Sequence, residues 1–98
     1  MTCILTLISA PSMEETLIDW LLTRDDISGF SSVEIYGHGS RSTNLTLLEQ
    51  VTGRQKRIQF LIHTQTEVAK RLVDELKHQY PNTGLHYMMT PILEAGQI

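Results

Sequence analysis

The residues best suited to chemistry lie in the middle of the chain, between two apolar stretches. The run Gly37-His38-Gly39 is followed by four basic residues, Arg41, Arg54, Lys56 and Arg57. Glycine lets backbone N–H groups approach a phosphate closely, and guanidinium and ammonium groups pair with anions. We therefore predict a ligand-binding site made of Gly37, His38, Gly39, Arg41, Lys56 and Arg57. The same residues also fit a solvated loop whose basic side chains only keep it soluble.

The charge of this segment differs from that of the whole chain. Residues 38–57 carry four basic side chains and one acidic side chain, Glu49, whereas the net charge of the chain is -3. A basic segment on an acidic body favours contact with an anion or an acidic partner. The overall acidity argues against a general nucleic-acid binder. The segment contains neither a P-loop nor a dinucleotide fingerprint.

Histidines are the candidate metal ligands. We predict His38, His63 and His86 as candidates, with Met88 as a soft donor of the kind that Cu(I) prefers. Their spacing does not match a structural zinc site, so a metal would need one histidine from each of several copies. Surface or hydrogen-bonded histidines are the alternative. No triad or nucleophile motif is present, and the sequence predicts no enzyme.

Hydrophobic periodicity predicts the elements that position these residues. Strands are expected at 3–9, 31–37, 56–63 and 85–90, and two helices after the capping-box patterns Ser12–Glu15 and Thr64–Glu67. The order β-α-β-β-α-β predicts an α+β, ferredoxin-like domain over residues 1–98, with two helices on one face of an antiparallel four-stranded sheet. A flexible loop is expected at about 38–54, and a tail at 92–98. The apolar residues of the loop either form a short helix ended by Gly53 or extend the two flanking strands.

The alternation of each strand predicts two faces of the sheet. We expect one set of apolar residues to face the helices: Cys3, Leu5, Leu7, Val33, Ile35, Ile58, Phe60, Ile62, Leu85, Tyr87 and Met89. The other face would carry Ile4, Thr6, Ile8, Glu34, Tyr36, Gln59, Leu61, His63, His86 and Met88. That face is too apolar for water, so we predict that further copies of the chain cover it. Coverage by the tail is the alternative.

Composition sets the class of protein. Ninety-eight residues with 41% hydrophobic side chains suit one ordered domain. The lone Cys3 fits a reducing cytoplasm, which is the predicted location. The first residues lack a basic region typical of a signal peptide, and no apolar run reaches the ~20 residues of a membrane span. We expect no direct insertion into a membrane.

Residues 29–41 resemble the PII-like signalling proteins, in which the second strand ends in a glycine-rich stretch and opens into a long T-loop. Element order and loop position agree over nearly the whole chain. The chain is most similar to a bacterial PII-like family of unknown function associated with heavy-metal efflux systems. Gly37, Gly39 and Arg41 occupy family ligand positions. Residues 80–85 replace the Gly-Asp-Gly-Lys segment of nucleotide-binding members, and the C-terminal arginine pair has no counterpart.

The resemblance implies a homotrimer with ligands in the clefts between subunits, near the base of the loop. The ligand would be a small molecule such as a nucleotide, and the loop would dock on a transporter or efflux protein. The first alternative is a Cu- or Zn-binding tolerance protein of the CutA type. The second is a small ferredoxin-like enzyme, although residues 8–16 lack the glycine and arginine of an acylphosphatase loop. The identity of the ligand and of the partner stays open.

Overall fold

The computed structural model describes residues 1–39 and 54–98. Its elements follow the predicted order: β1 (Thr2–Ser9), the 3-10 turn η1 (Pro11–Met13), α1 (Glu14–Leu22), β2 (Ser31–Gly37), β3 (Gln55–Gln65), α3 (Thr66–Gln79) and β4 (His86–Pro91). The conformation predicted for residues 40–53, and with it Arg41, lies outside the described part of the chain.

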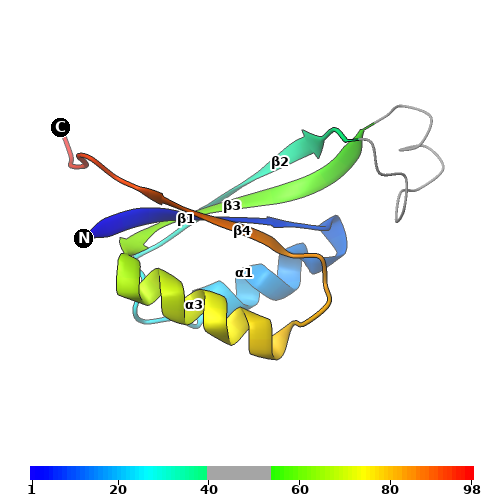
Figure 1. Cartoon of the computed structure of the whole chain (residues 1–98), viewed down its shortest axis with the longest axis horizontal. Helices are drawn as coiled ribbons and strands as arrows, with labels where there is room; N and C mark the ends of the chain where they lie inside the picture. Colours follow the sequence, from blue (N-terminus) through cyan, green and yellow to red (C-terminus); the bar gives the residue numbers. More distant parts are fainter. Residues whose placement is uncertain (40–53) are drawn as a thin grey trace.

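The four strands form one antiparallel sheet in the order β2-β3-β1-β4. Both helices lie on the same face of this sheet, and no element of residues 1–39 or 54–98 covers the opposite face (Figure 1). The α+β, ferredoxin-like prediction is therefore confirmed. Neither helix of the described residues is long and apolar enough to cross a membrane.

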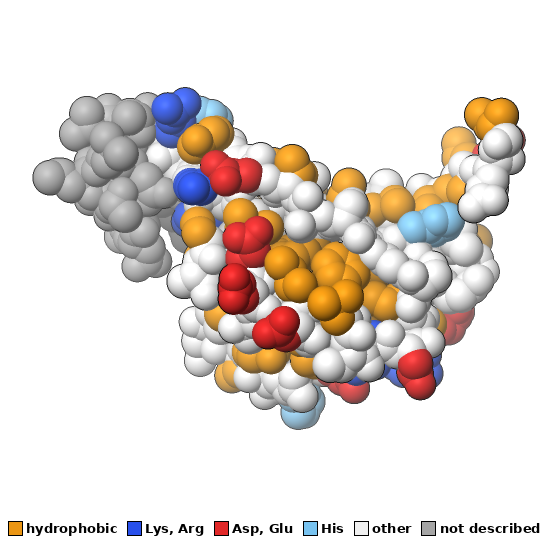
Figure 2. All heavy atoms as spheres, turned by 180° about the vertical axis from the view of Figure 1, so that it is seen from behind, with side chains coloured by type: hydrophobic (Ala, Val, Ile, Leu, Met, Phe, Trp, Pro, Cys, Tyr) orange, Lys and Arg blue, Asp and Glu red, His pale blue; other side chains and the backbone are white. Residues whose placement is uncertain are grey.

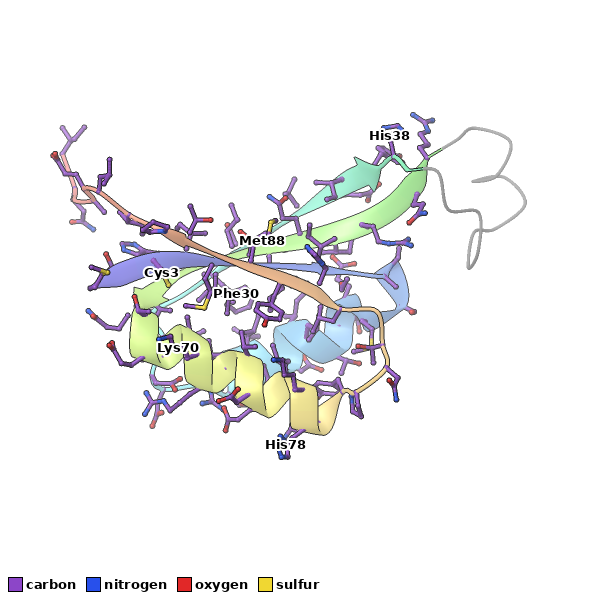
Figure 3. The ribbon with its side chains drawn as sticks, viewed as in Figure 1. Cys3, Phe30, His38, Lys70, His78 and Met88 are labelled. Atoms are coloured by element: carbon purple, nitrogen blue, oxygen red, sulfur yellow. The ribbon has the colours of Figure 1, made fainter. Side chains whose placement is uncertain are left out.

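The core lies between the sheet and the helices. Phe60 is fully buried at its centre, and its ring centroid is 6.3 Å from that of Phe30, which points down from the segment before β2 (Figure 3). The predicted inward residues of β1 and β3 are buried, as are the apolar stripes of the two helices: Cys3, Leu5, Leu7, Leu17, Leu21, Ile58, Ile62, Ala69, Leu72, Val73 and Leu76.

Neither predicted capping box forms. Met13 and Gln65 occupy the N-cap positions of α1 and α3, and neither side chain makes a capping hydrogen bond. Thr64 instead belongs to β3, because the pairing with β1 continues as far as Thr2 opposite Gln65. The first turn of α3 is held by Thr66, whose backbone N–H and hydroxyl both donate to the carbonyl oxygen of Met1, at 2.9 and 3.1 Å.

The predicted orientation of β2 was wrong. Its register with β3 places Ser32 opposite Phe60 and Glu34 opposite Ile58. Directly paired residues point to the same face, so Ser32, Glu34 and Tyr36 lie on the helix side. The apolar residues Val33 and Ile35 therefore lie on the uncovered face. Alternation showed that β2 has an apolar side, but the partner strand determines which way that side points.

An ion-pair cluster joins the turn after α1 to α3. The Arg24 guanidinium donates to both carboxylate oxygens of Asp26, at 3.2 and 2.9 Å, and lies 2.6 Å from a carboxylate oxygen of Glu75. The hydrogen bond from Arg24 is the largest effect on the pKa of Asp26 and lowers it. Desolvation acts in the opposite direction, and the charges of Arg24 and Arg71 lower the pKa further. Asp26 and Arg24 are mostly buried, so this cluster fixes the chain where it enters β2.

We expect Asp26→Asn to lower the free energy of unfolding by about 1 kcal/mol at neutral pH. Because the pKa of Asp26 is lower in the folded state, its contribution is present above the unfolded pKa of about 3.9 and is lost as the pH falls through the folded value. Urea unfolding of both proteins across this range should show the difference shrinking in acid. Asp25→Asn is the exposed control and should change little. A difference that is constant with pH would contradict the role of this carboxylate.

Candidate ligand site at the base of the β2–β3 hairpin

The predicted ligand residues that the structure describes lie where β2 ends and β3 begins, at residues 36–39 and 54–57, here called the hairpin base. The two strands are paired there, with Gly37 opposite Gln55, Tyr36 opposite Lys56 and Ile35 opposite Arg57. The hairpin base extends beyond the helices (Figure 1), and basic side chains gather at this end of the molecule (Figure 2). Antiparallel pairing thus places Gly37 beside Gln55, next to Lys56 in sequence, and His38 and Gly39 follow where this pairing ends.

The basic residues of the hairpin base do not all face the same way. Lys56 shares the helix side of the sheet with Tyr36, whereas Arg57 shares the uncovered face with Ile35. Arg54, which was not among the predicted site residues, stacks its guanidinium over the Tyr36 ring at 4.6 Å. The sequence hint for this contact was Tyr36 itself, an aromatic residue close to the basic segment, because arginine commonly stacks on aromatic rings. The site therefore has a helix-side group of Arg54, Lys56 and Tyr36, and a separate cation, Arg57, on the other face.

The cations of the hairpin base contact both side-chain and backbone oxygens. Lys56 Nζ lies 3.5 Å from a carboxylate oxygen of Glu34, and both side chains are 49% exposed, so this ion pair is weak. Arg57 donates to the side-chain oxygen of Gln55 at 2.6 Å and to the carbonyl oxygen of Lys56 at 2.7 Å. These contacts orient the Arg57 guanidinium. Both acceptors are neutral oxygens, and no carboxylate of the described residues forms an ion pair with it.

The described residues leave room for a larger side chain at both Gly37 and Gly39. A Cβ at Gly37 would lie 3.9 Å from the carbonyl oxygen of Gln55, which is an ordinary contact, and a Cβ at Gly39 would meet nothing within 4 Å. Neither is among the described residues with positive φ, which are Asn82 and Gly84. The expectation that the glycines allow a ligand close to the backbone remains a prediction.

The candidate metal ligands are far apart in one chain. His63 lies opposite Ile4 and His86 opposite Ile8, on strands that flank β1, so they are about 13 Å apart along the sheet alone. His38 follows β2 at the hairpin base, at the other end of β3 from His63 (Figure 3). Within residues 1–39 and 54–98, no three His, Cys, Asp or Glu residues form a group that could hold a metal ion.

The uncovered face of the sheet carries apolar side chains from all four strands, with the polar residues Thr6 and Gln59 among them. We call it the open face, defined by Ile4, Ile8, Val33, Ile35, Leu61 and Met88. Val33 is 51% exposed and Met88 46% exposed. Met88 projects away from the helices in Figure 3, and apolar side chains follow the upper edge of the molecule in Figure 2. The corrected orientation of β2 makes this face more apolar than predicted, because Val33 and Ile35 replace Glu34 and Tyr36.

Comparison with known proteins identifies the family of this chain. A family model described as "Protein of unknown function (DUF3240)" matches residues 1–98. The chain belongs to the DUF3240 family. No curated protein matches it. A solved DUF3240 family protein from Shewanella baltica OS155 superposes with a TM-score of 0.79 at 21% identity, over 99% of this chain and 96% of that one.

Two other groups of solved structures share the fold of this DUF3240 protein. The CutA protein from Archaeoglobus fulgidus, described as a periplasmic divalent cation tolerance protein, gives a TM-score of 0.72 at 13% identity, over 99% of this chain and 89% of that one. A putative PII-like signalling protein from Thermus thermophilus gives 0.63 at 20% identity, over 90% and 83%. The resemblance to the PII-like and CutA-like superfamily is thereby confirmed at the level of fold.

Proposed function

We propose that this DUF3240 protein is a homotrimeric regulatory protein of the PII type. Copies of the chain cover each other's open faces, a small anionic ligand binds between subunits at the hairpin base, and the loop at about 38–54 docks on a partner. The observation that carries the proposal is the apolar open face, which one chain leaves exposed to water. The likeness to PII-like and CutA structures supports it.

The two faces of the hairpin base suggest a division of roles. Arg57 lies on the side that neighbouring copies would cover, so it is placed to contact a ligand in a cleft between subunits. Arg54 and Lys56 lie on the outer side, together with Tyr36, where a docked partner would meet them. In this proposal the partner is a transporter or an efflux component with an acidic surface, because the exposed cations favour negative charge.

We expect native mass spectrometry to show the mass of three 11.1 kDa chains. With ADP or inorganic pyrophosphate added as anionic ligands, bound mass should appear on the trimer. Arg57→Gln should weaken this binding about tenfold, as expected for the loss of one charge-assisted contact. Lys56→Gln is the matched control on the opposite face and should retain binding. Equal losses in both variants would contradict the assignment of Arg57 to the cleft, and a single-chain mass would contradict the proposal as a whole.

Metal binding is the second candidate function. Its support is the placement of His86 and Met88 two residues apart on β4, both toward the open face, where an assembly would bring copies together. The name of the CutA relatives, divalent cation tolerance proteins, agrees with this candidate. Calorimetric titration with Cu and Zn, compared between the native protein and His63→Ala and His86→Ala, separates it from the first candidate. Binding that survives both substitutions would exclude these histidines as ligands.

We still predict that this protein is not an enzyme. The compared structures are described as signalling or cation tolerance proteins, which fits a regulatory protein. We place this protein in the cytoplasm because its one cysteine, Cys3, is buried and unpaired, as is usual for proteins of a reducing compartment.

A further inference from the structure

A pocket of about 310 Å³ lies between the C-terminal half of α3 and the start of β4. Its lining includes the fully buried Leu7 of β1 and the α3 residues Val73 and Leu76. Leu85, just before β4, and Tyr87 of β4 also line it. We call it the α3–β4 pocket. Its lining is mainly apolar, and its volume is at the lower end of the range for small-molecule sites in proteins.

The turn that closes the α3–β4 pocket is conformationally fixed. Asn82 and Gly84 both have positive φ, 60° and 74°, which asparagine and glycine adopt most readily. The Thr83 hydroxyl donates to the carbonyl oxygen of Tyr80 at 3.0 Å, and the Tyr80 N–H donates to the carbonyl oxygen of Leu76 at 2.9 Å. These bonds hold the turn against the end of α3, so the pocket is formed before any ligand arrives.

One positive charge lies on the lining of the pocket. Lys77 Nζ is 5.3 Å from the centroid of the Tyr87 ring, and both residues line the pocket and are exposed to solvent. Among the described residues that line the pocket, Lys77 alone is charged. A single ammonium suits one negative charge, whereas a polyphosphate is usually held by several cations and backbone N–H groups. The apolar walls suit a compact hydrocarbon group.

We propose that the α3–β4 pocket binds a small monocarboxylate with an aromatic or branched aliphatic group. The hydrocarbon group lies between Leu76 and Leu85 over Leu7, and the carboxylate pairs with Lys77 at the opening. This site is within one subunit and is built from elements other than the hairpin base. It therefore adds a second ligand class to the anionic ligand of the proposed function.

Phenylacetate is a suitable test ligand, and phenylacetamide is its neutral match. Titration of the full-length ¹⁵N-labelled protein followed by NMR should give phenylacetate a Kd on the order of 1 mM, because the ligand is small. Shift changes should be confined to residues of the pocket. The amide should bind about tenfold more weakly, and Lys77→Met should weaken phenylacetate binding by about the same factor. Lys70→Met, on an exposed position of α3 two turns away (Figure 3), should leave the Kd unchanged.

A pocket-filling variant tests the location independently of charge. Leu85→Trp places a larger ring in the lining of the pocket and should abolish phenylacetate binding while the melting temperature shifts little, because Leu85 is only partly buried at the edge of the core. The proposal would be overturned if the acid and the amide bound with equal affinity, or if no binding were seen. It would also be overturned if the shift changes lay at residues 54–57 instead of the pocket, or if Leu85→Trp bound phenylacetate unchanged.

Discussion

Val33→Glu is expected to convert the assembled protein into single chains. Val33 lies at the centre of β2 on the open face and is 51% exposed in one chain. If neighbouring copies cover this face, the substitution places an unpaired carboxylate in each interface, at a cost of several kcal/mol per site. Sedimentation velocity should then report a particle of 11.1 kDa instead of one three times that mass.

Two controls make this result specific. Because the Val33 side chain makes no core contact in the single chain, the far-UV circular dichroism of Val33→Glu should match that of the native protein. Leu22→Glu changes a residue that is 68% exposed on α1, on the helix side of the molecule, and should leave the assembly intact. An unchanged particle mass for Val33→Glu would show that the open face is not the contact surface.

Phe60→Ala should be the most destabilising single substitution in the core. The side chain is fully buried at the centre of β3, between the sheet and both helices. Removing a buried phenylalanine costs about 3–5 kcal/mol, because hydrophobic transfer energy is lost and a cavity is left. That is a large part of the total stability of a domain of this size, so part of the variant should be unfolded at physiological temperature. Chemical denaturation monitored by circular dichroism gives the difference directly.

Phe30→Ala is the matched comparison for Phe60→Ala. Its ring lies 6.3 Å from that of Phe60 but is only partly buried, so its loss should cost clearly less. The two rings are in contact, so the double variant should lose less than the sum of the single losses. Equal costs for the two single substitutions would show that the core is centred elsewhere.

The predicted site is only partly assembled in the structure. The position of the basic residues at the loop base follows from the two strand patterns that flank them, and the structure agrees. Whether Lys56 and Arg57 act together does not follow from their types, because consecutive strand residues point to opposite faces. The contact between Arg54 and Tyr36 depends on the pairing of two strands and was missed. His63 and His86 were expected on the same face of the sheet, and they lie there, but the register separates them along the strand direction.

Most elements, their order and the buried side of β1 and β3 could be read from the chain alone. Those features depend on the period of apolar residues within a short segment, which is a local property. The direction of β2, the start of α3 without its capping box, and the α3–β4 pocket could not be read in this way. Each depends on contacts between residues distant in sequence, such as Glu34 with Ile58, Thr66 with Met1, and Leu7 with Tyr87 beside the pocket. Side-chain alternation defines two faces for a strand, and only pairing with a neighbour determines which of them is buried.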